Sequence, residues 1–265
     1  VPMMHNVLLA HGRAVQTLRQ MVPDCKVSIA PCARVIYPYD ENSQADIEAA
    51  RKAYLSVTPE RCFNSVTLWS DPIILGKYPD DALQLLGEYL PENYEKDMKI
   101  ISEPLDYYTQ NIYNGMNPLS VDSDGNIIEI PQKVGHPRIT NPGWYMKPEV
   151  IYWAPKYLYE RYKMPILITE NGTCCHDWVF LDGKVHDPNR IDYITRYLRQ
   201  LNRAIEEGVD VRGYFVWSFL DNWEWGRGYD ERYGLVYVDF ETLERTPKDS
   251  YYWYKTVIEE NGKNI

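Results

Sequence analysis

Short apolar runs alternate with amphipathic helical segments along this chain, and no polar linker separates them. This alternation is typical of parallel βα units, in which each strand is followed by a helix that covers the sheet. A complete βα barrel uses about eight strands in about 250 residues. Only four strand segments are recognisable here, at residues 26–40, 103–115, 166–172 and 211–221. The sequence therefore predicts one α/β domain over residues 1–265 that resembles half of a larger barrel with long loops.

The segments between these runs carry recognisable helix and turn signals. The clearest helix spans residues 187–208, where Asp187 is the expected N-cap. Its apolar residues form one stripe: Ile191, Ile194, Leu198, Leu201 and Ile205. Pro155 should kink or split the helix expected at residues 147–162. An Asp-Gly turn predicts a hairpin around residues 124–125. Further helices are expected at residues 2–21, 43–55 and 246–262.

Composition and charge argue against several classes of function. The 28 basic and 38 acidic residues give a net charge of −10 without a basic cluster, so nucleic acid and anionic membranes are poor partners. No apolar run approaches the roughly 20 residues of a membrane span. The five cysteines lack a framework spacing, which suggests reduced thiols and a cytoplasmic location. The five histidines lack metal-ligand spacing, so we expect neither a metal nor a cofactor.

Carboxylates lie where two of the expected strands end, which is where barrel enzymes place catalytic groups. Glu170 is the expected last residue of its strand, before an Asn-Gly turn. The segment 217–233 interleaves acids with tryptophan and tyrosine, a composition that suits a sugar site. The plainer alternatives are a capping or ion-paired acid for Glu170 and a packed surface loop for residues 217–233. From the residues alone, Glu170 and Glu224 would be the two catalytic carboxylates.

Several long motifs, in order along the whole chain, resemble those of glycoside hydrolase family 1, the β-glucosidase family. They are HNVLLAHGRAV at 5–15, NIYNG at 111–115, ITENG at 168–172, FVWSFLDNWEW at 215–225, RYGLVYVDF at 232–240 and RTPKDSYYWYKTVI at 245–258. The resemblance implies a (β/α)8 TIM barrel, of which this chain would supply roughly strands 5 to 8, the C-terminal half.

The resemblance also implies a retaining mechanism and a role for each matching residue. Glu170 would be the nucleophile, forming a covalent glycosyl-enzyme that water then hydrolyses. Tyr113 would hydrogen-bond and orient this nucleophile, Trp217 would stack on the sugar face, and Glu224 would bind ring hydroxyls. The residues implied to contact the substrate, a β-glucoside or a short β-linked oligosaccharide, are Asn111, Trp217, Glu224, Trp225 and Tyr233.

The second catalytic acid of the family has no counterpart in this sequence. The family's acid/base glutamate belongs to a Thr-x-Asn-Glu-Pro motif, and no Asn-Glu-Pro occurs here. The resemblance therefore contradicts the pairing of Glu170 with Glu224. We expect the acid/base in an N-terminal half that precedes Val1, and we expect the chain alone to be nearly inactive. Its partner would be that half or a second copy, because a half barrel leaves strand edges to cover.

Two alternative functions remain open from the sequence. A 6-phospho-β-glucosidase would resemble this chain but usually replaces the Glu-Trp pair and holds the phosphate with a serine and a lysine. Here Glu224 is retained, and Glu231 stands where a lysine would be expected and would repel phosphate. The non-enzyme alternative is a catalytically incomplete fragment that binds sugar.

Overall fold

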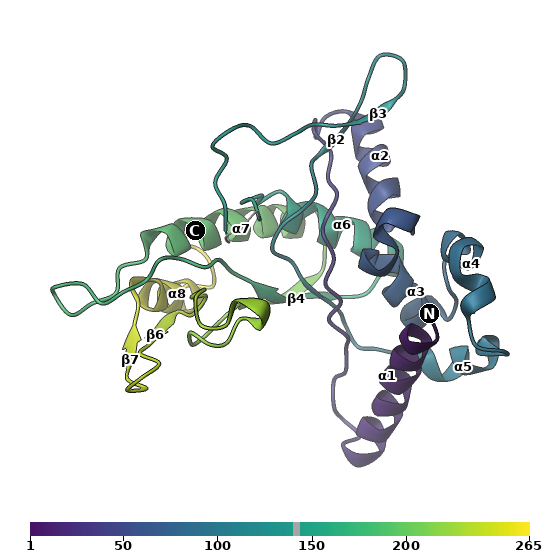
Figure 1. Ribbon diagram of the computed structural model, residues 1–265, viewed down its shortest axis with the longest axis horizontal. Helices are drawn as coiled ribbons and strands as arrows, with labels where there is room; N and C mark the ends of the chain where they lie inside the picture. The colour runs from purple at the N-terminus through teal and green to yellow at the C-terminus, as the bar shows by residue number, and fades with distance from the viewer. Residues whose placement is uncertain (140–143) are drawn as a thin grey trace.

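A three-stranded parallel sheet lies at the centre of the molecule in the computed structural model, which describes residues 1–139 and 144–265 (Figure 1). Its strands are β1 (Tyr108–Asn111), β4 (Ile166–Asn171) and β5 (Val211–Val216), in the order β1-β4-β5. Because the strands are parallel, their C-terminal ends lie at one edge of the sheet. Three of the four expected strand segments therefore form regular strands in the expected direction.

The fourth expected strand, within residues 26–40, does not form as a regular strand. Its residues make only isolated parallel bridges, Cys32 with Asn111, Val35 with Gly115, and Pro38 with Leu119. Proline has no N–H to donate, so Pro31 and Pro38 interrupt any ladder that passes through this segment. The segment thus runs beside β1 with the predicted neighbour and direction, but the prediction of a regular strand is wrong.

Strand β4 also ends one residue later than expected, at Asn171 rather than Glu170. Asn171 is fully buried, and its side-chain amide donates to the carbonyl of Ile112 at 2.7 Å and to the Tyr193 hydroxyl at 2.9 Å. The buried Asn171 side chain therefore links the end of β4 to the residue after β1 and to the helix that carries Tyr193. The turn begins after Asn171.

The helices divide into two groups. Figure 1 shows α1 to α5 gathered on one side of the sheet, while α6, α7 and α8 lie behind it and on its other side. The helices are α1 (Pro2–Met21), α2 (Gln44–Leu55), α3 (Val66–Leu75), α4 (Asp80–Leu86), α5 (Tyr94–Ile101), α6 (Val150–Tyr162), α7 (Pro188–Glu206) and α8 (Asp249–Glu259). Short 3₁₀ helices are η1 (Pro59–Asn64), η2 (Gly87–Tyr89) and η3 (Trp225–Arg227). Two antiparallel hairpins complete the described elements: β2 (Leu119–Val121) with β3 (Ile127–Glu129), and β6 (Val236–Val238) with β7 (Arg245–Pro247).

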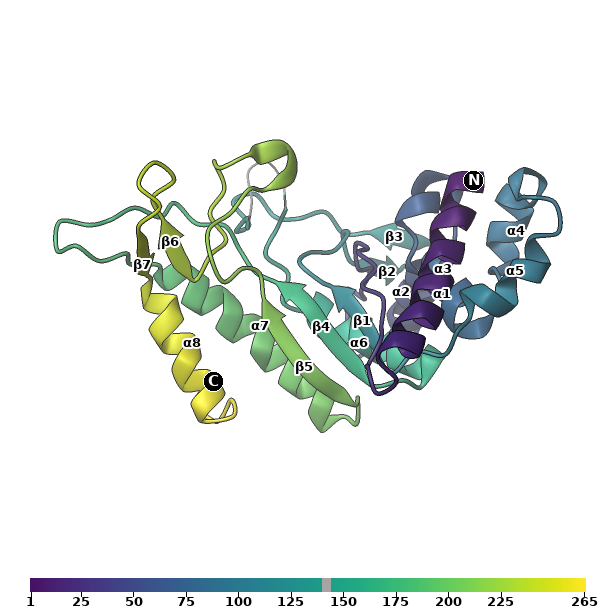
Figure 2. The ribbon, with the colours of Figure 1, turned by 90° about the horizontal axis from the view of Figure 1, so that it is seen from below.

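Helices α6 and α7 cover one face of the sheet (Figure 2). The core between them is rich in tyrosine, and the rings of Tyr193 and Tyr197 stack with centroids 4.1 Å apart. Helix α6 is continuous through Pro155, so of the predicted kink or split the split is wrong, and the kink stays a prediction. Asp187 precedes α7 as predicted, but its carboxylate does not cap the helix. It accepts instead from the Ser250 backbone N–H at 2.8 Å, which ties α7 to α8.

The opposite face of the sheet is less covered. In β4, buried Ile166 and Ile168 alternate with half-buried Leu167 and Thr169, which is the pattern of a strand packed on one face only. In β5, the side chain of Phe215 is 57% exposed. This exposed face is what a half barrel would present on its inner side.

Helices α1, α3, α4 and α5 pack around a second, smaller apolar cluster of their own. Helices α1 and α5 cross so closely that a Cβ on Gly12 would lie 2.0 Å from the carbonyl oxygen of Ile100. His5 is buried at this crossing, between the Tyr78 hydroxyl at 2.9 Å and the Asp97 carboxylate at 3.0 Å. Among the described residues, no helix is both long and apolar enough to cross a membrane.

Candidate active site

Glu170 and Tyr113 meet at the C-terminal edge of the sheet. Glu170 lies near the end of β4, and its Cα pairs with that of Asn111, the last residue of β1. The register shifts at this point, and two residues later the Tyr113 hydroxyl donates to Glu170 Oε2 at 2.6 Å. Burial raises the pKa of Tyr113, and the hydrogen bond and negative charge of Glu170 raise it further. Tyr113 therefore remains a protonated donor, and it fixes one oxygen of the carboxylate.

Asn111 stands on the neighbouring strand position. Its Oδ1 accepts a hydrogen bond of 2.7 Å from the Thr169 hydroxyl, the residue directly before Glu170. This bond links β1 to β4 on the face that no helix covers. Among the described residues the Asn111 side-chain amide donates to no other group, so it is available to a ligand at the same edge.

Trp217 and Glu224 come from the segment that follows β5. The backbone N–H of Trp217 donates to the carbonyl of Asn171 at 2.9 Å, which places the ring next to the end of β4. The indole Nε1 donates to Glu224 Oε2 at 3.3 Å. Burial raises the pKa of Glu224, the Trp217 hydrogen bond opposes this shift, and the charges of Glu231 and Glu170 add to it. The negative charges of Glu170 and Glu231 therefore both act on Glu224, and the three carboxylates make this region negative.

Tyr233 lies in the interior of the protein, whereas Trp225 lies on its surface. Tyr233 is buried, and its pKa is raised first by burial and further by neighbours that include Cys174, Glu231 and Glu224. The Tyr233 hydroxyl therefore lies close enough to Glu224 to be affected by its charge. Trp225 begins η3 and its side chain is 84% exposed, so the described structure does not pack this ring against Glu224 or Trp217.

A buried ionic cluster supports the segment that carries Trp217, Glu224 and Tyr233. The Lys248 amine, which is fully buried, donates to Asp177 at 2.6 Å and to Asp221 at 2.8 Å. Asp221 also accepts from the backbone N–H of Gly234 at 2.9 Å. Because Asp221 and Gly234 flank the part that carries Glu224 and Tyr233, this cluster closes that part at its base.

The remaining members of the cluster balance its charge. Arg190 donates to Asp177 at 2.7 Å and also pairs with Asp187, and both ends of these ion pairs are buried. Arg232 donates to Asp221 at 2.7 Å. Three aspartates thus face two arginines and one lysine. A buried charge is expensive unless it is paired in this way.

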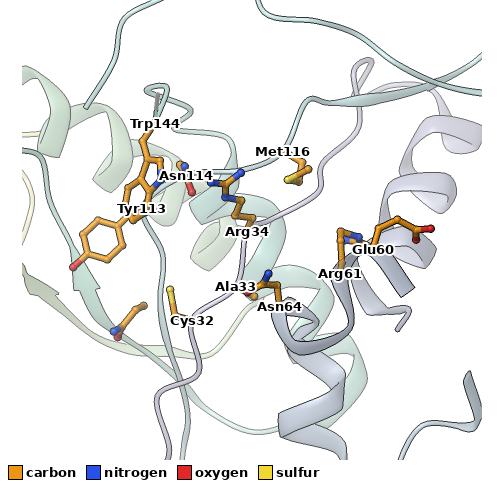
Figure 3. A pocket seen from close by; sticks show the side chains of 11 residues that line it. Cys32, Ala33, Arg34, Glu60, Arg61, Asn64, Tyr113, Asn114, Met116 and Trp144 are labelled. Atoms are coloured by element: carbon orange, nitrogen blue, oxygen red, sulfur yellow. The ribbon is translucent and has the colours of Figure 1, made fainter. Parts of the chain in front are cut away.

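A cavity of about 450 Å³ adjoins Tyr113 on the side away from the helices behind the sheet (Figure 3). Trp144 lies against Tyr113 with ring centroids 5.7 Å apart. Partial burial raises the pKa of the Cys32 thiol, and the negative charge of Glu170 adds to this shift. Because Tyr113 lines the cavity and binds Glu170, the carboxylate lies next to this end of the cavity. The described lining residues are Cys32, Ala33, Arg34, Glu60, Arg61, Asn64, Asn111, Tyr113, Asn114, Met116 and Trp144.

The sequence did not reveal the ionic cluster or most of this cavity. Charged residues such as Lys248 and Arg190 are usually exposed, so their burial has no signal in a hydrophobic pattern. Trp144 and Arg34 come from loops whose course depends on tertiary contacts. In the described part of the chain, no group of histidine, cysteine, aspartate or glutamate side chains is arranged to hold a metal ion.

Comparison with known proteins gives consistent matches over nearly the whole chain. The model of the family described as Glycosyl hydrolase family 1 matches residues 1–263. The chain is 43% identical over 263 residues to beta-glucosidase A from Thermotoga maritima, a match that covers 97% of this chain and 56% of that protein. It is 40% identical over 266 residues to beta-glucosidase A from Acetivibrio thermocellus, with the same coverage.

The structural matches agree with the sequence matches. The chain superposes on the Thermotoga maritima beta-glucosidase in complex with glucoimidazole with a TM-score of 0.80 and 43% identity, covering 97% of this chain and 56% of that one. The same enzyme in complex with deoxynojirimycin gives a TM-score of 0.81 at 42% identity, covering 98% of this chain and 56% of that one. These relatives are TIM-barrel β-glucosidases, and this chain spans about half of their length.

Proposed function

The chain belongs to glycosyl hydrolase family 1, and from this premise we propose that it supplies the nucleophile half of a retaining β-glucosidase. It would correspond to strands 5 to 8 of the barrel. The observation that carries the proposal is the 2.6 Å hydrogen bond from Tyr113 to Glu170 at the C-terminal edge of the sheet. Trp217 and Glu224 lie beside this pair, as a sugar site requires.

In the proposed reaction, Glu170 attacks the anomeric carbon of a β-glucoside. A bond forms between a carboxylate oxygen and that carbon while the bond to the leaving oxygen breaks, and the leaving oxygen takes a proton from a general acid. Water then hydrolyses the glycosyl-enzyme. Because Tyr113 donates to Oε2, the other oxygen of Glu170 is available for attack. Tyr113 thereby orients the nucleophile.

The sugar would be held by groups from three segments. The Trp217 ring would stack on one face of the glucose, and Glu224 would accept hydrogen bonds from its hydroxyls. Asn111 and Tyr233 would contact the sugar from either side of Glu170. Trp225 would join this set only when further groups cover its exposed side chain.

The general acid would come from the other half of the barrel. Retaining enzymes hold their two carboxyl groups about 5–5.5 Å apart, across the scissile bond. The sequence contains no Asn-Glu-Pro, and Glu224 is engaged by the Trp217 indole. We therefore assign Glu224 to binding and expect the 265 residues alone to be nearly inactive. All five cysteines are free, which supports our proposal of a reducing, cytoplasmic location.

A 6-phospho-β-glucosidase is a weaker alternative. Glu231 adds to the raised pKa of Glu224, so two negative charges act where a glucose 6-phosphate would be held. The relatives named above are β-glucosidases. These two observations favour unphosphorylated sugars.

The test is Glu170→Gln in the complete barrel, meaning this chain together with the other half. The amide is nearly isosteric but cannot act as the nucleophile, so we expect hydrolysis of 4-nitrophenyl β-glucoside to fall by about 10³-fold or more. Glu170→Gly should recover part of the activity with azide and release the inverted glucosyl azide. The exposed Glu259→Gln is the matched control. Full activity of Glu170→Gln would refute the assignment.

A further inference from the structure

The cavity beside Tyr113 adjoins the proposed nucleophile. Tyr113 joins the two places, because its hydroxyl binds Glu170 while its ring lines the cavity. The cavity continues from there to η1, where Arg61 and Asn64 line its far side (Figure 3). A group attached to the anomeric carbon could therefore run from Glu170 toward η1.

The wall of the cavity away from Glu170 carries more basic than acidic side chains, although the whole chain has a net charge of −10. The charged side chains among the described lining residues are Arg34, Arg61 and Glu60, while Glu170 lies at the Tyr113 end. In Figure 3 the Glu60 carboxylate points away from Tyr113, beyond Arg61, so the two guanidinium groups are nearer the nucleophile.

Both arginines lack a carboxylate partner within the described residues. Arg61 donates to the backbone carbonyl of Ala53 at 2.5 Å, and no ion pair involves it there. Burial lowers the pKa of Arg61, which marks a cation that has lost part of its water shell. Arg34 has an exposed side chain with no protein hydrogen bond in the same described part. Such guanidinium groups pair strongly with a planar carboxylate.

With the leaving group in this cavity, as the proposed function requires, we propose that Arg34 and Arg61 select leaving groups that carry a carboxylate. This inference rests on the proposed β-glucosidase function. The ring of Trp144 and the side chain of Met116 supply an apolar wall, and the arginines supply the charge. The substrate class that fits is the β-glucoside of an aromatic carboxylic acid, attached through its phenolic oxygen.

The experiment compares 4-carboxyphenyl β-glucoside with its neutral counterpart, 4-carbamoylphenyl β-glucoside. The kcat/KM ratio of acid to amide is measured for the complete barrel and for Arg34→Gln, Arg61→Gln and the double variant. We expect the double variant to lower this ratio about tenfold, since a hydrogen bond to a charged group is lost. Arg212→Gln is the matched control, because Arg212 is exposed at the start of β5 and pairs with Asp210. It should leave the ratio unchanged.

A second measurement separates this inference from the proposed function. Binding of 4-hydroxybenzoate and 4-hydroxybenzamide is measured by calorimetry, which requires no hydrolysis. Preference for the benzoate that disappears in Arg34→Gln supports the inference, and it does so even in a protein that hydrolyses no glucoside. Equal binding of both compounds, or hydrolysis with an acid-to-amide ratio that the arginine variants do not alter, overturns the inference and leaves the glucosidase function standing. Arg34 makes no hydrogen bond or ion pair with the described residues, so Arg34→Gln also tests the inference where Arg61→Gln unfolds.

Discussion

At the level of single residues, the pair of Tyr113 and Glu170 shows how a strand irregularity creates the contact to which we assign a catalytic role. The register between β1 and β4 shifts between Gln110 and Asn111. The shift lets the chain continue past the strand end so that Tyr113 faces Glu170. A tyrosine in a tyrosine-rich chain has no special signal in the sequence, and only the resemblance to a known family assigned this role to Tyr113.

The first residue-scale prediction is that Tyr113→Phe lowers kcat about 10- to 100-fold in the complete barrel, because a hydrogen bond to a charged group contributes about 1.5–3 kcal/mol. KM should change little, since phenylalanine keeps the ring against Trp144. Steady-state kinetics with 4-nitrophenyl β-glucoside measures both constants. Tyr252→Phe, an exposed position on α8, is the control. Unchanged kcat in Tyr113→Phe would mean that the hydroxyl does not act on the nucleophile.

The second residue-scale prediction concerns Glu224, whose pKa is raised by burial. A carboxyl with a raised pKa holds its proton more tightly in the folded than in the unfolded protein. The stability that it contributes is therefore present below its ordinary pKa and is lost as the pH rises through the raised value. Denaturant midpoints of the wild type should fall relative to those of Glu224→Gln as the pH rises above about 4.5. Parallel curves for the two proteins would contradict this prediction.

At the level of elements, the sequence predicted regular structure well and buried polar structure poorly. The stripe of Ile191, Ile194 and Leu198 predicted α7, and the Asp-Gly turn predicted the β2-β3 hairpin, because periodicity and turn chemistry are local. The prolines in residues 26–40 are evident in the sequence. Whether they interrupt the hydrogen bonds between strands depends on which neighbouring strand pairs with them, and the sequence does not show this. Site residues at strand ends were predicted by position, whereas Trp144 and Arg34 depend on loop packing.

The element-scale prediction is that Lys248→Met destabilises the protein strongly. The Lys248 amine joins the start of α8 to the segments after β4 and β5. Its removal takes one cationic hydrogen-bond donor away from each of the buried carboxylates of Asp177 and Asp221. Breaking a buried ion pair in this way costs about 3–5 kcal/mol. Urea denaturation of Lys248→Met and of Lys255→Met, an exposed control, measures the difference. The control should change stability by about 0.5 kcal/mol or less.

A loss below about 1 kcal/mol in Lys248→Met would show that water replaces the amine, since surface ion pairs contribute only that much. A loss of the predicted size should be accompanied by weaker binding of glucose analogues, because Asp221 and Gly234 would no longer close the segment that carries Glu224.

At the level of the whole molecule, the sheet ends with strands whose outer sides are incompletely paired. Strand β5 has no strand beyond it in the described part of the chain, and the segment 26–40 gives β1 only isolated bridges. The side chains of Phe215 and Phe219 are 57% and 61% exposed. Exposed strand edges with apolar side chains favour association with another strand.

The whole-molecule prediction is that residues 1–265 alone associate with a second copy or aggregate, and that the other half of the barrel replaces this contact. Mass photometry should show species larger than the 31.2 kDa monomer. Mixing with the other half should give a one-to-one complex and raise hydrolysis of 4-nitrophenyl β-glucoside about 10²–10⁴-fold, the range for general acid help. A stable monomer with full activity would contradict both statements.

The ionic cluster also bears on when the site forms during synthesis. Lys248 follows Asp177 by 71 residues, so β4 and Glu170 leave the ribosome well before the amine that neutralises Asp177 and Asp221. Until then, the segment from Trp217 to Tyr233 lacks the amine that joins Asp221 to Asp177. Glu170 is therefore synthesised before the ionic cluster is complete, and the proposed binding surface around it is completed only when the last helix docks.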